Sequence, residues 1–208
     1  MTDTWPSLVF AGLGAFHGLN PAMGWLFAVA LGLHRQSRTV VWASLLPIAL
    51  GHALSIAVVT AVLAATGYLF PQEFVRIAAG VSLLAWAAYH WRFGHRHRVR
   101  FGMQVGLLGL AAWSFLMATA HGAGLMLWPA LMPLCASSST GEAGLGGSLL
   151  AMLAGVGLHT AAMLATTAVV AIIVYEWLGV SLLRRAWLNL DLLWTFALVV
   201  TGALLLLL

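Results

Sequence analysis

Long apolar stretches separated by short polar links make up most of the chain. A membrane-spanning helix needs about 20 consecutive, mostly apolar residues, and six stretches reach or approach this length. We expect spans at Ser7–Leu33, Val40–Gly67, Phe74–Trp91, Gln104–Leu131, Ser148–Tyr175 and Ala186–Leu208. The pattern predicts an all-α polytopic membrane protein with six transmembrane helices, which form a single transmembrane domain over residues 1–208.

Composition agrees with this pattern and excludes other classes of protein. Hydrophobic residues make up 62% of the 208 positions and charged residues only 7%, whereas soluble domains carry about 25% charged residues. Such a chain cannot cover a water-facing surface, which excludes a soluble enzyme, a nucleic-acid-binding protein and a disordered protein. We therefore expect the lipid bilayer, and no nucleic acid, as a partner. The single cysteine, Cys135, excludes an internal disulfide.

Arginines are distributed very unevenly over the links. Eight of the nine basic residues fall in links that lie on one side of the predicted membrane: Arg35, Arg38, Arg92, Arg96, Arg98, Arg100, Arg184 and Arg185. Only Arg76 falls on the other side. Because positively charged loops remain in the cytoplasm, this bias predicts a protein of a bacterial cytoplasmic membrane with both termini outside. No basic residue precedes the first stretch, so we expect it to be a span and not a cleaved signal peptide.

The two halves of the chain resemble each other. We divide it into repeat one (about 7–91), a cytoplasmic linker (about 92–103) and repeat two (about 104–208). When the second and fifth stretches are aligned without a gap, His52 falls on His159. Each half holds three spans, so the halves lie in opposite orientations, as in the inverted repeats of many transporters. Chance similarity between apolar helices is the alternative.

Four of the apolar stretches each contain a histidine, and these are His17, His52, His121 and His159. A helical rise of about 1.5 Å per residue places each within roughly 10 Å of the bilayer midplane. An ionisable group at that depth is expensive and faces a cavity or a partner instead of lipid. The structural alternative for each histidine is a bond to a backbone carbonyl at a helix break. The symmetric placement of the four favours a shared site.

Glycine and proline residues close to each histidine predict broken helices. They are Gly18, Pro21, Pro47, Gly51, Gly122, Gly124, Pro129, Gly155 and Gly157. Interrupted helices at corresponding positions of two halves point to the binding site of a transporter. Ordinary kinks are the alternative, because glycine and proline are common in membrane helices.

Residues 17–23 read His-Gly-Leu-Asn-Pro-Ala-Met. This segment resembles the His-Ala-x-Asp-Pro-Asp-His signature of nickel/cobalt permeases. That family belongs to a group of small six- or seven-span transporters that includes urease-accessory permeases, lysine exporters and sulfite exporters. The resemblance implies a transporter in which His17 and Pro21 match the signature directly. Asn20 and Ala22 stand where the signature has aspartates, and Met23 stands at its second histidine.

Imidazole, carboxamide and thioether groups are therefore the candidate ligands. Met23, Met126 and Met163 follow three of the four histidines by four to six residues. Thioether with imidazole suits soft Cu(I), and imidazole alone suits Zn, Ni or Cu(II). Without an anionic ligand we expect a soft or monovalent transition-metal cation as the substrate, with other small solutes left open, and the residues imply no particular cofactor. Imidazole titrates near neutral pH, so transport could be coupled to protons. The methionines could also be ordinary apolar filler.

Two further features leave alternatives open. Asp191, in the sixth stretch, either supplies negative charge to the interior or pairs with Arg184 or Arg185 near the cytoplasmic interface. The loop that contains His95 and His97 either collects metal or fixes topology and contacts lipid headgroups through its arginines.

The leading hypothesis is a small secondary transporter. An accessory or assembly subunit of a membrane complex is one alternative, and a haem or redox protein with histidines on facing helices is another. We expect no enzyme, because no Ser-His-Asp set is recognisable, although Ser55 lies three residues from His52. A unit of this size is compatible with a homodimer.

Overall fold

The computed structural model describes residues 5–93, 106–139, 145–178 and 190–207. These residues form eight α-helices, one 3-10 turn and one π-helical turn, with no strand among them. The prediction of an all-α protein is confirmed. In chain order the elements are α1 Trp5–Leu19, η1 Pro21–Met23, α2 Trp25–Arg35, α3 Arg38–Leu69, α4 Gln72–Phe93, α5 Leu107–Ala120, α6 Ala123–Ser139, α7 Leu145–Ile173, η3 Val174–Leu178 and α9 Leu190–Leu207.

The first predicted span is interrupted where the sequence predicts a break. Helix α1 ends at Leu19, and Asn20 takes an extended conformation before the 3-10 turn that begins at Pro21. Gly24, between this turn and α2, has a φ of 134°. A residue with a side chain would be strained in this conformation. Two indole N–H groups donate to carbonyls that the break leaves free, Trp25 to Leu19 at 3.0 Å and Trp113 to Ala22 at 3.1 Å.

The fourth predicted span is interrupted in a related way. Helices α5 and α6 meet at an angle of 58°. Between them His121 caps α5, and Gly122 has a φ of 69°, in the left-handed region that favours glycine. The Trp86 indole N–H donates to the Ala120 carbonyl at this bend. The predicted break in the second half is thus also present.

Two of the four predicted breaks are wrong. Helix α3 runs without interruption through Pro47 and Gly51, and α7 runs through Gly155. Helix α7 also runs through Gly157, where an added Cβ atom would have no neighbour within 4 Å, whereas Gly51 and Gly155 serve close packing. A Cβ atom on Gly51 would overlap the backbone carbonyl of Ala111 in α5, and one on Gly155 would meet the ring of Phe10 in α1.

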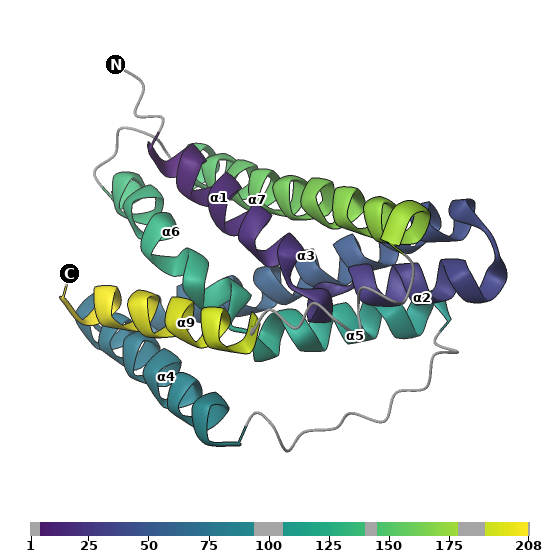
Figure 1. Cartoon of the computed structure of the whole chain (residues 1–208). Coiled ribbons are helices and arrows are strands. Elements are labelled where there is room, and N and C mark those ends of the chain that lie inside the picture. The colour runs from purple at the N-terminus through teal and green to yellow at the C-terminus, as the bar shows by residue number, and fades with distance from the viewer. Residues whose placement is uncertain (1–4, 94–105, 140–144, 179–189, 208) are drawn as a thin grey trace.

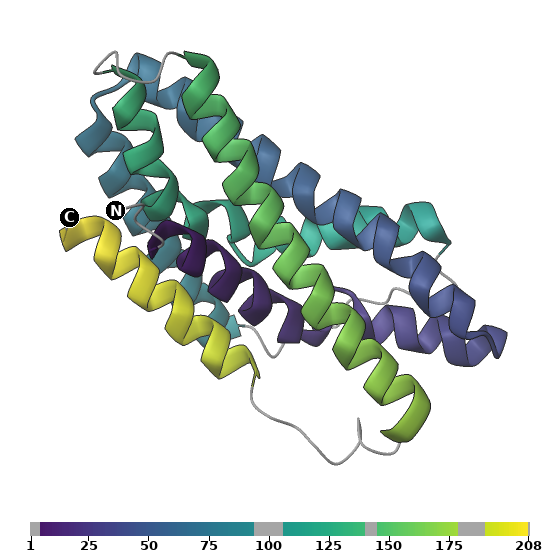
Figure 2. The ribbon, with the colours of Figure 1, turned by 90° about the horizontal axis from the view of Figure 1, so that it is seen from above.

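The helices associate in three main pairs: α1 with α7, α3 with α5, and α4 with α9. Figure 2 shows α3 and α7 as the two longest rods, running in opposite directions. The start of α1 and the end of α9 lie toward the same end of the bundle in both views (Figures 1 and 2).

Length and apolar composition make two segments able to cross a membrane, Arg38–Leu63 and Leu150–Trp177. The bent pair of α5 and α6 is a third candidate if it is counted as one span. Pro6–Leu19 and Trp194–Leu207 are shorter apolar helices. Along α3, one exposed face carries apolar side chains at every fourth position: Leu46, Leu50, Leu54, Val58 and Val62. A helix that is apolar on its outer face as well as its inner face is typical of a lipid environment.

Candidate functional site: a buried histidine cluster

Three of the four predicted histidines meet in the interior. His17 comes from α1, His52 from α3 and His159 from α7, and none of the three has any solvent-exposed surface. Their ring centroids lie 5.0 to 5.6 Å apart. The rings of His52 and His159 are nearly parallel, and their Nε2 atoms are 3.2 Å apart in a hydrogen bond. We call these three residues the histidine cluster.

The histidine cluster lies halfway along a long helix. His159 is the middle residue of the 29-residue α7, so about 21 Å of helix lies on either side of it. Gly14 and Gly18 give α1 a flat face against α7. Cβ atoms there would overlap the carbonyl oxygens of His159 and Met163. This close approach of two backbones brings the His17 ring within reach of the other two.

The hydrogen bonds leave ring nitrogens of the cluster without partners. His17 Nδ1 lies 2.8 Å from the Leu13 carbonyl oxygen, which can only accept, so Nδ1 carries the proton. In the neutral ring His17 Nε2 is then an acceptor, and it is buried without a partner within the described residues. The Nδ1 atoms of His52 and His159 are likewise buried and unbonded there. A buried polar atom without a partner costs about 1–3 kcal/mol, so this is a place where a ligand would be stabilised.

The distance between the two Nε2 atoms is informative for metal binding. Two nitrogens on one tetrahedral metal ion are about 3.3 Å apart at ordinary metal–nitrogen lengths, close to the 3.2 Å observed for His52 and His159. In the part of the chain that the structure describes, no group of three or more His, Cys, Asp or Glu side chains is arranged to hold a metal ion. A metal ion here would replace the shared proton, and the His17 ring would have to turn toward it.

His121 does not join the cluster. Its Nδ1 lies 2.8 Å from the Met117 carbonyl oxygen, the same bond to the fourth preceding residue that His17 makes. Its ring contacts the indole of Trp194 at 5.0 Å, and His17 contacts the same indole at 4.7 Å. Trp194 therefore contacts both His121 and one member of the histidine cluster.

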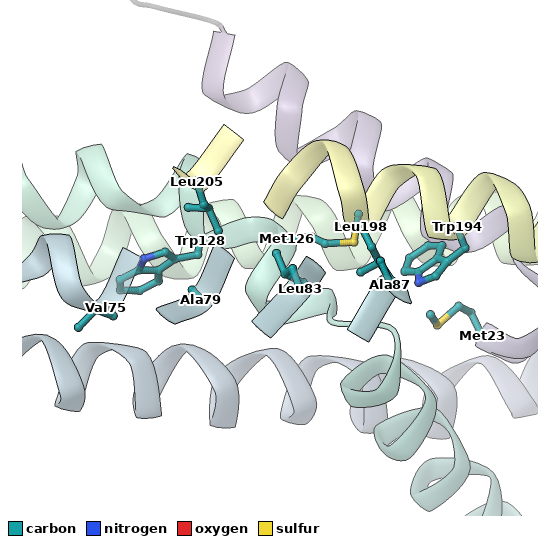
Figure 3. Packing of buried hydrophobic residues seen from close by; sticks show 10 residues of the cluster. All are labelled: Met23, Val75, Ala79, Leu83, Ala87, Met126, Trp128, Trp194, Leu198 and Leu205. Atoms are coloured by element: carbon teal, nitrogen blue, oxygen red, sulfur yellow. The ribbon is translucent and has the colours of Figure 1, made fainter. Parts of the chain in front are cut away.

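The other predicted pathway residues bond to the backbone or pack among apolar side chains. Asn20 Oδ1 accepts a hydrogen bond from the Ala22 backbone N–H at 3.0 Å, so it caps the 3-10 turn that Pro21 begins. Met23 and Met126 are buried in one apolar cluster with Trp194, as Figure 3 shows. Met163 is buried in a second apolar cluster. The methionines therefore pack among apolar side chains, and the Met163 sulfur also accepts a hydrogen bond from the Thr167 hydroxyl at 3.5 Å.

Several predicted features lie partly or wholly outside the described residues. Asp191 falls in α9, but its side chain is not described, and Arg184, Arg185 and the loop with His95 and His97 lie outside the described ranges. Ser55 is described, and its hydroxyl bonds to that of Thr119 at 2.8 Å.

Four tryptophans near the helix breaks and the histidine cluster were not among the predicted site residues. Trp86, Trp113 and Trp25 bond carbonyls at the two helix breaks, and Trp194 contacts His17 and His121. The positions of two of these tryptophans in the sequence could have indicated an interior role. Membrane tryptophans favour the interfaces, whereas Trp86 and Trp194 lie inside the third and sixth stretches.

Comparisons of the chain with protein-family models, with curated proteins and with solved structures find no match.

Proposed function

We propose that the protein is a small secondary transporter that moves a transition-metal cation through the histidine cluster. The observation that carries this proposal is the convergence of three fully buried imidazoles from three helices, with unbonded ring nitrogens. Ionisable groups at such depth in a membrane protein mark substrate or ion pathways. The sequence resemblance to the nickel/cobalt permease group supports the same function.

A six-span architecture with two inverted three-helix repeats is part of this proposal. Repeat one pairs its first span with the second span of repeat two, since α1 packs on α7. Repeat two does the reverse, since α5 packs on α3. The third spans of the two repeats, α4 and α9, pack on each other. This exchange is the pattern that a two-fold axis between repeats produces.

An ion pair supports the opposite orientation of the repeats. Arg38, the first residue of α3, lies with its Nε 3.3 Å from Glu176 Oε1, just beyond the end of α7. The equivalent helices α3 and α7 therefore run antiparallel, as an inverted repeat requires. On this proposal the arginine-rich end faces the cytoplasm of a bacterial cell, and both termini lie outside.

The chemistry of the cluster favours a soft, low-charge ion. Its donors are neutral imidazoles, and a divalent ion without an anionic ligand at that depth is poorly compensated. Singly charged Cu(I) needs the least charge compensation among first-row ions, and imidazole donors also suit Zn, Ni and Cu(II). When a metal ion takes up the Nε2 atoms of His52 and His159, the proton between them has to move, either to an unbonded Nδ1 of the same ring or out of the cluster. Only the second route releases a proton and would couple metal transport to proton transport.

Metal uptake into liposomes tests the proposal with the isolated chain. Purified protein is reconstituted around an encapsulated metal indicator, and Cu(I) held reduced, Zn²⁺, Ni²⁺ and Co²⁺ are added separately. We expect flux of at least one ion and a loss of ten-fold or more in the His52→Ala/His159→Ala double variant. His34→Ala, which removes an exposed histidine of α2, is the matched control and keeps the flux.

Two results would overturn the proposal. Wild-type liposomes that take up no more metal than protein-free ones would favour an accessory subunit, which needs a partner to transport. Equal flux in the wild type and the double variant would remove the histidine cluster from the pathway.

A further inference from the structure

A second pair of histidines lies on the other side of Trp194. His90, in the last turn of α4, has its ring centroid 6.0 Å from that of His121. His90 is partly exposed and is followed by the exposed Trp91 and Arg92. These residues begin the arginine-rich link in the middle of the chain. We call His90 and His121 the access pair, because one member reaches the surface while the other is 8% exposed.

Aromatic contacts connect the access pair to the histidine cluster through one residue. The Trp194 indole contacts His121 at 5.0 Å on one side and His17 at 4.7 Å on the other, in both cases edge to face. Phe16 stacks on the same indole with its plane only 7° away and its centroid at 5.3 Å. From the surface inward, the order is thus His90, His121, Trp194 and His17.

Trp194 differs from the tryptophans around it in how it is held. The N–H groups of Trp25, Trp86 and Trp113 each donate to a carbonyl at a helix break. Trp194 Nε1 is buried and has no acceptor among the described residues. A rotation of the Trp194 side chain therefore breaks no hydrogen bond, and any acceptor that it meets elsewhere lowers its free energy.

We propose that His90 and His121 are a second binding site, on the arginine-rich side, and that Trp194 is the gate between this site and the histidine cluster. The inference rests on the transport function proposed above, because a gate implies a pathway. The ion passes from the access pair to His17 when the indole swings away, and the ring returns to its stack on Phe16 afterwards. Figure 3 shows Trp194 above Met23 in the apolar cluster, with Leu198 farther along the same helix.

Chemical modification of histidine tests the gate without using any metal. The full chain in lipid nanodiscs is treated with diethyl pyrocarbonate, and each histidine is assigned by mass spectrometry. In the wild type we expect modification of His90 and protection of His17. In Trp194→Ala we expect the His17 modification rate to rise at least ten-fold, since its free Nε2 becomes reachable from His121. Trp194→Phe keeps a ring in place and preserves the protection.

Leu198→Ala is the matched control. Leu198 lies one turn beyond Trp194, is fully buried in the same apolar cluster, and on truncation leaves a cavity without opening a route between histidines. We expect its His17 rate to equal that of the wild type. Trp194→Leu provides a second reading should Trp194→Ala not fold, because leucine fills the space but is too short to contact both histidines.

The outcomes separate the gate from the transport function. A His17 rate that is unchanged in both Trp194→Ala and Trp194→Leu, or that rises equally in Leu198→Ala, overturns the gate. Metal flux that persists in that case leaves the proposed transport function standing. A His17 modification rate that rises in Trp194→Ala, together with an absence of metal flux in liposomes, would support the gate and contradict the proposed transport of metal.

Discussion

At the scale of single residues, the bond between His52 and His159 joins two helices at a point where no exposed atom of either ring remains. Each ring satisfies one nitrogen of the other. Removal of one partner leaves the other nitrogen buried and unbonded, which costs more than the hydrogen bond itself contributes. The two residues should therefore be strongly coupled.

A double-mutant cycle measures this coupling. We expect His52→Ala and His159→Ala each to lower the free energy of unfolding by about 1–3 kcal/mol. The double variant should lose less than the sum of the two, with a coupling energy of about 0.5–3 kcal/mol. Denaturant unfolding in detergent gives the values, and His34→Ala, on an exposed surface, should change little. Strictly additive losses would contradict the bond.

Asn20 allows a capping role to be separated from a role in transport. We expect Asn20→Ala to lower stability by about 0.5–2 kcal/mol, since the acceptor for the Ala22 N–H is lost. Asn20→Ser retains a capping oxygen and should stay near the wild type in both stability and metal flux. A serine variant that is stable but inactive would show instead that the carboxamide binds the substrate.

The sequence predicts a shared depth for the four histidines, but it does not predict the directions of their rings. Counting residues along each stretch placed all four near the midplane, and three of them do meet. Which neighbour a ring points toward depends on how each helix is rotated about its axis. A stretch that is apolar on all sides does not specify that rotation. His121 and His17 both contact Trp194, a side chain from a helix far away in the sequence, and this contact is not predictable from the local sequence.

At the scale of helices, glycine positions determine how closely the pairs pack. Gly14 lies against the His159 carbonyl of α7, whereas a Cβ atom added to Gly12, two residues earlier on the same helix, would have no atom within 4 Å. Alanine raises helix propensity at both sites but meets a neighbouring helix only at Gly14. A comparison of the two alanine variants therefore separates the effect of packing from that of helix propensity.

We expect opposite signs from the two alanine variants. Gly14→Ala forces α1 and α7 apart and should destabilise by about 1–3 kcal/mol. Gly12→Ala places a methyl group in open space and should be neutral or stabilise by up to about 1 kcal/mol. Thermal unfolding of the two proteins in the same detergent compares them directly. Equal destabilisation would indicate that α1 and α7 do not pack through Gly14.

The helix breaks show where sequence reasoning succeeds and where it fails. Breaks at residues 20–24 and 121–122 were predictable, because Pro21 and Gly122 are residue types that weaken a helix locally. Pro47 and Gly51 carry the same local signal, yet α3 continues through them. Gly51 is used for contact with α5, a tertiary role that has the same appearance in a single sequence as a break.

At the scale of the whole molecule, the proposed inverted repeat makes a prediction about sides of the membrane. The gap-free alignment that matches His52 with His159 also matches Phe70 with Trp177, and both side chains are exposed, at 48% and 86%. Phe70 ends α3 and Trp177 lies just beyond α7, next to Glu176. If the repeats are inverted, these equivalent residues lie on opposite sides of the bilayer.

Cysteine labelling tests this arrangement in a Cys135→Ala background. We expect Phe70→Cys to react with a membrane-impermeant maleimide from outside intact cells, and Trp177→Cys to react at least five-fold faster in inside-out vesicles. Gln36→Cys, in the exposed turn between α2 and α3, should follow Trp177. Its turn adjoins Arg38, which pairs with Glu176. Reaction of Phe70 and Trp177 from the same side would mean that α3 and α7 do not cross in opposite directions. The symmetry that places the histidine cluster between two repeats would then be lost.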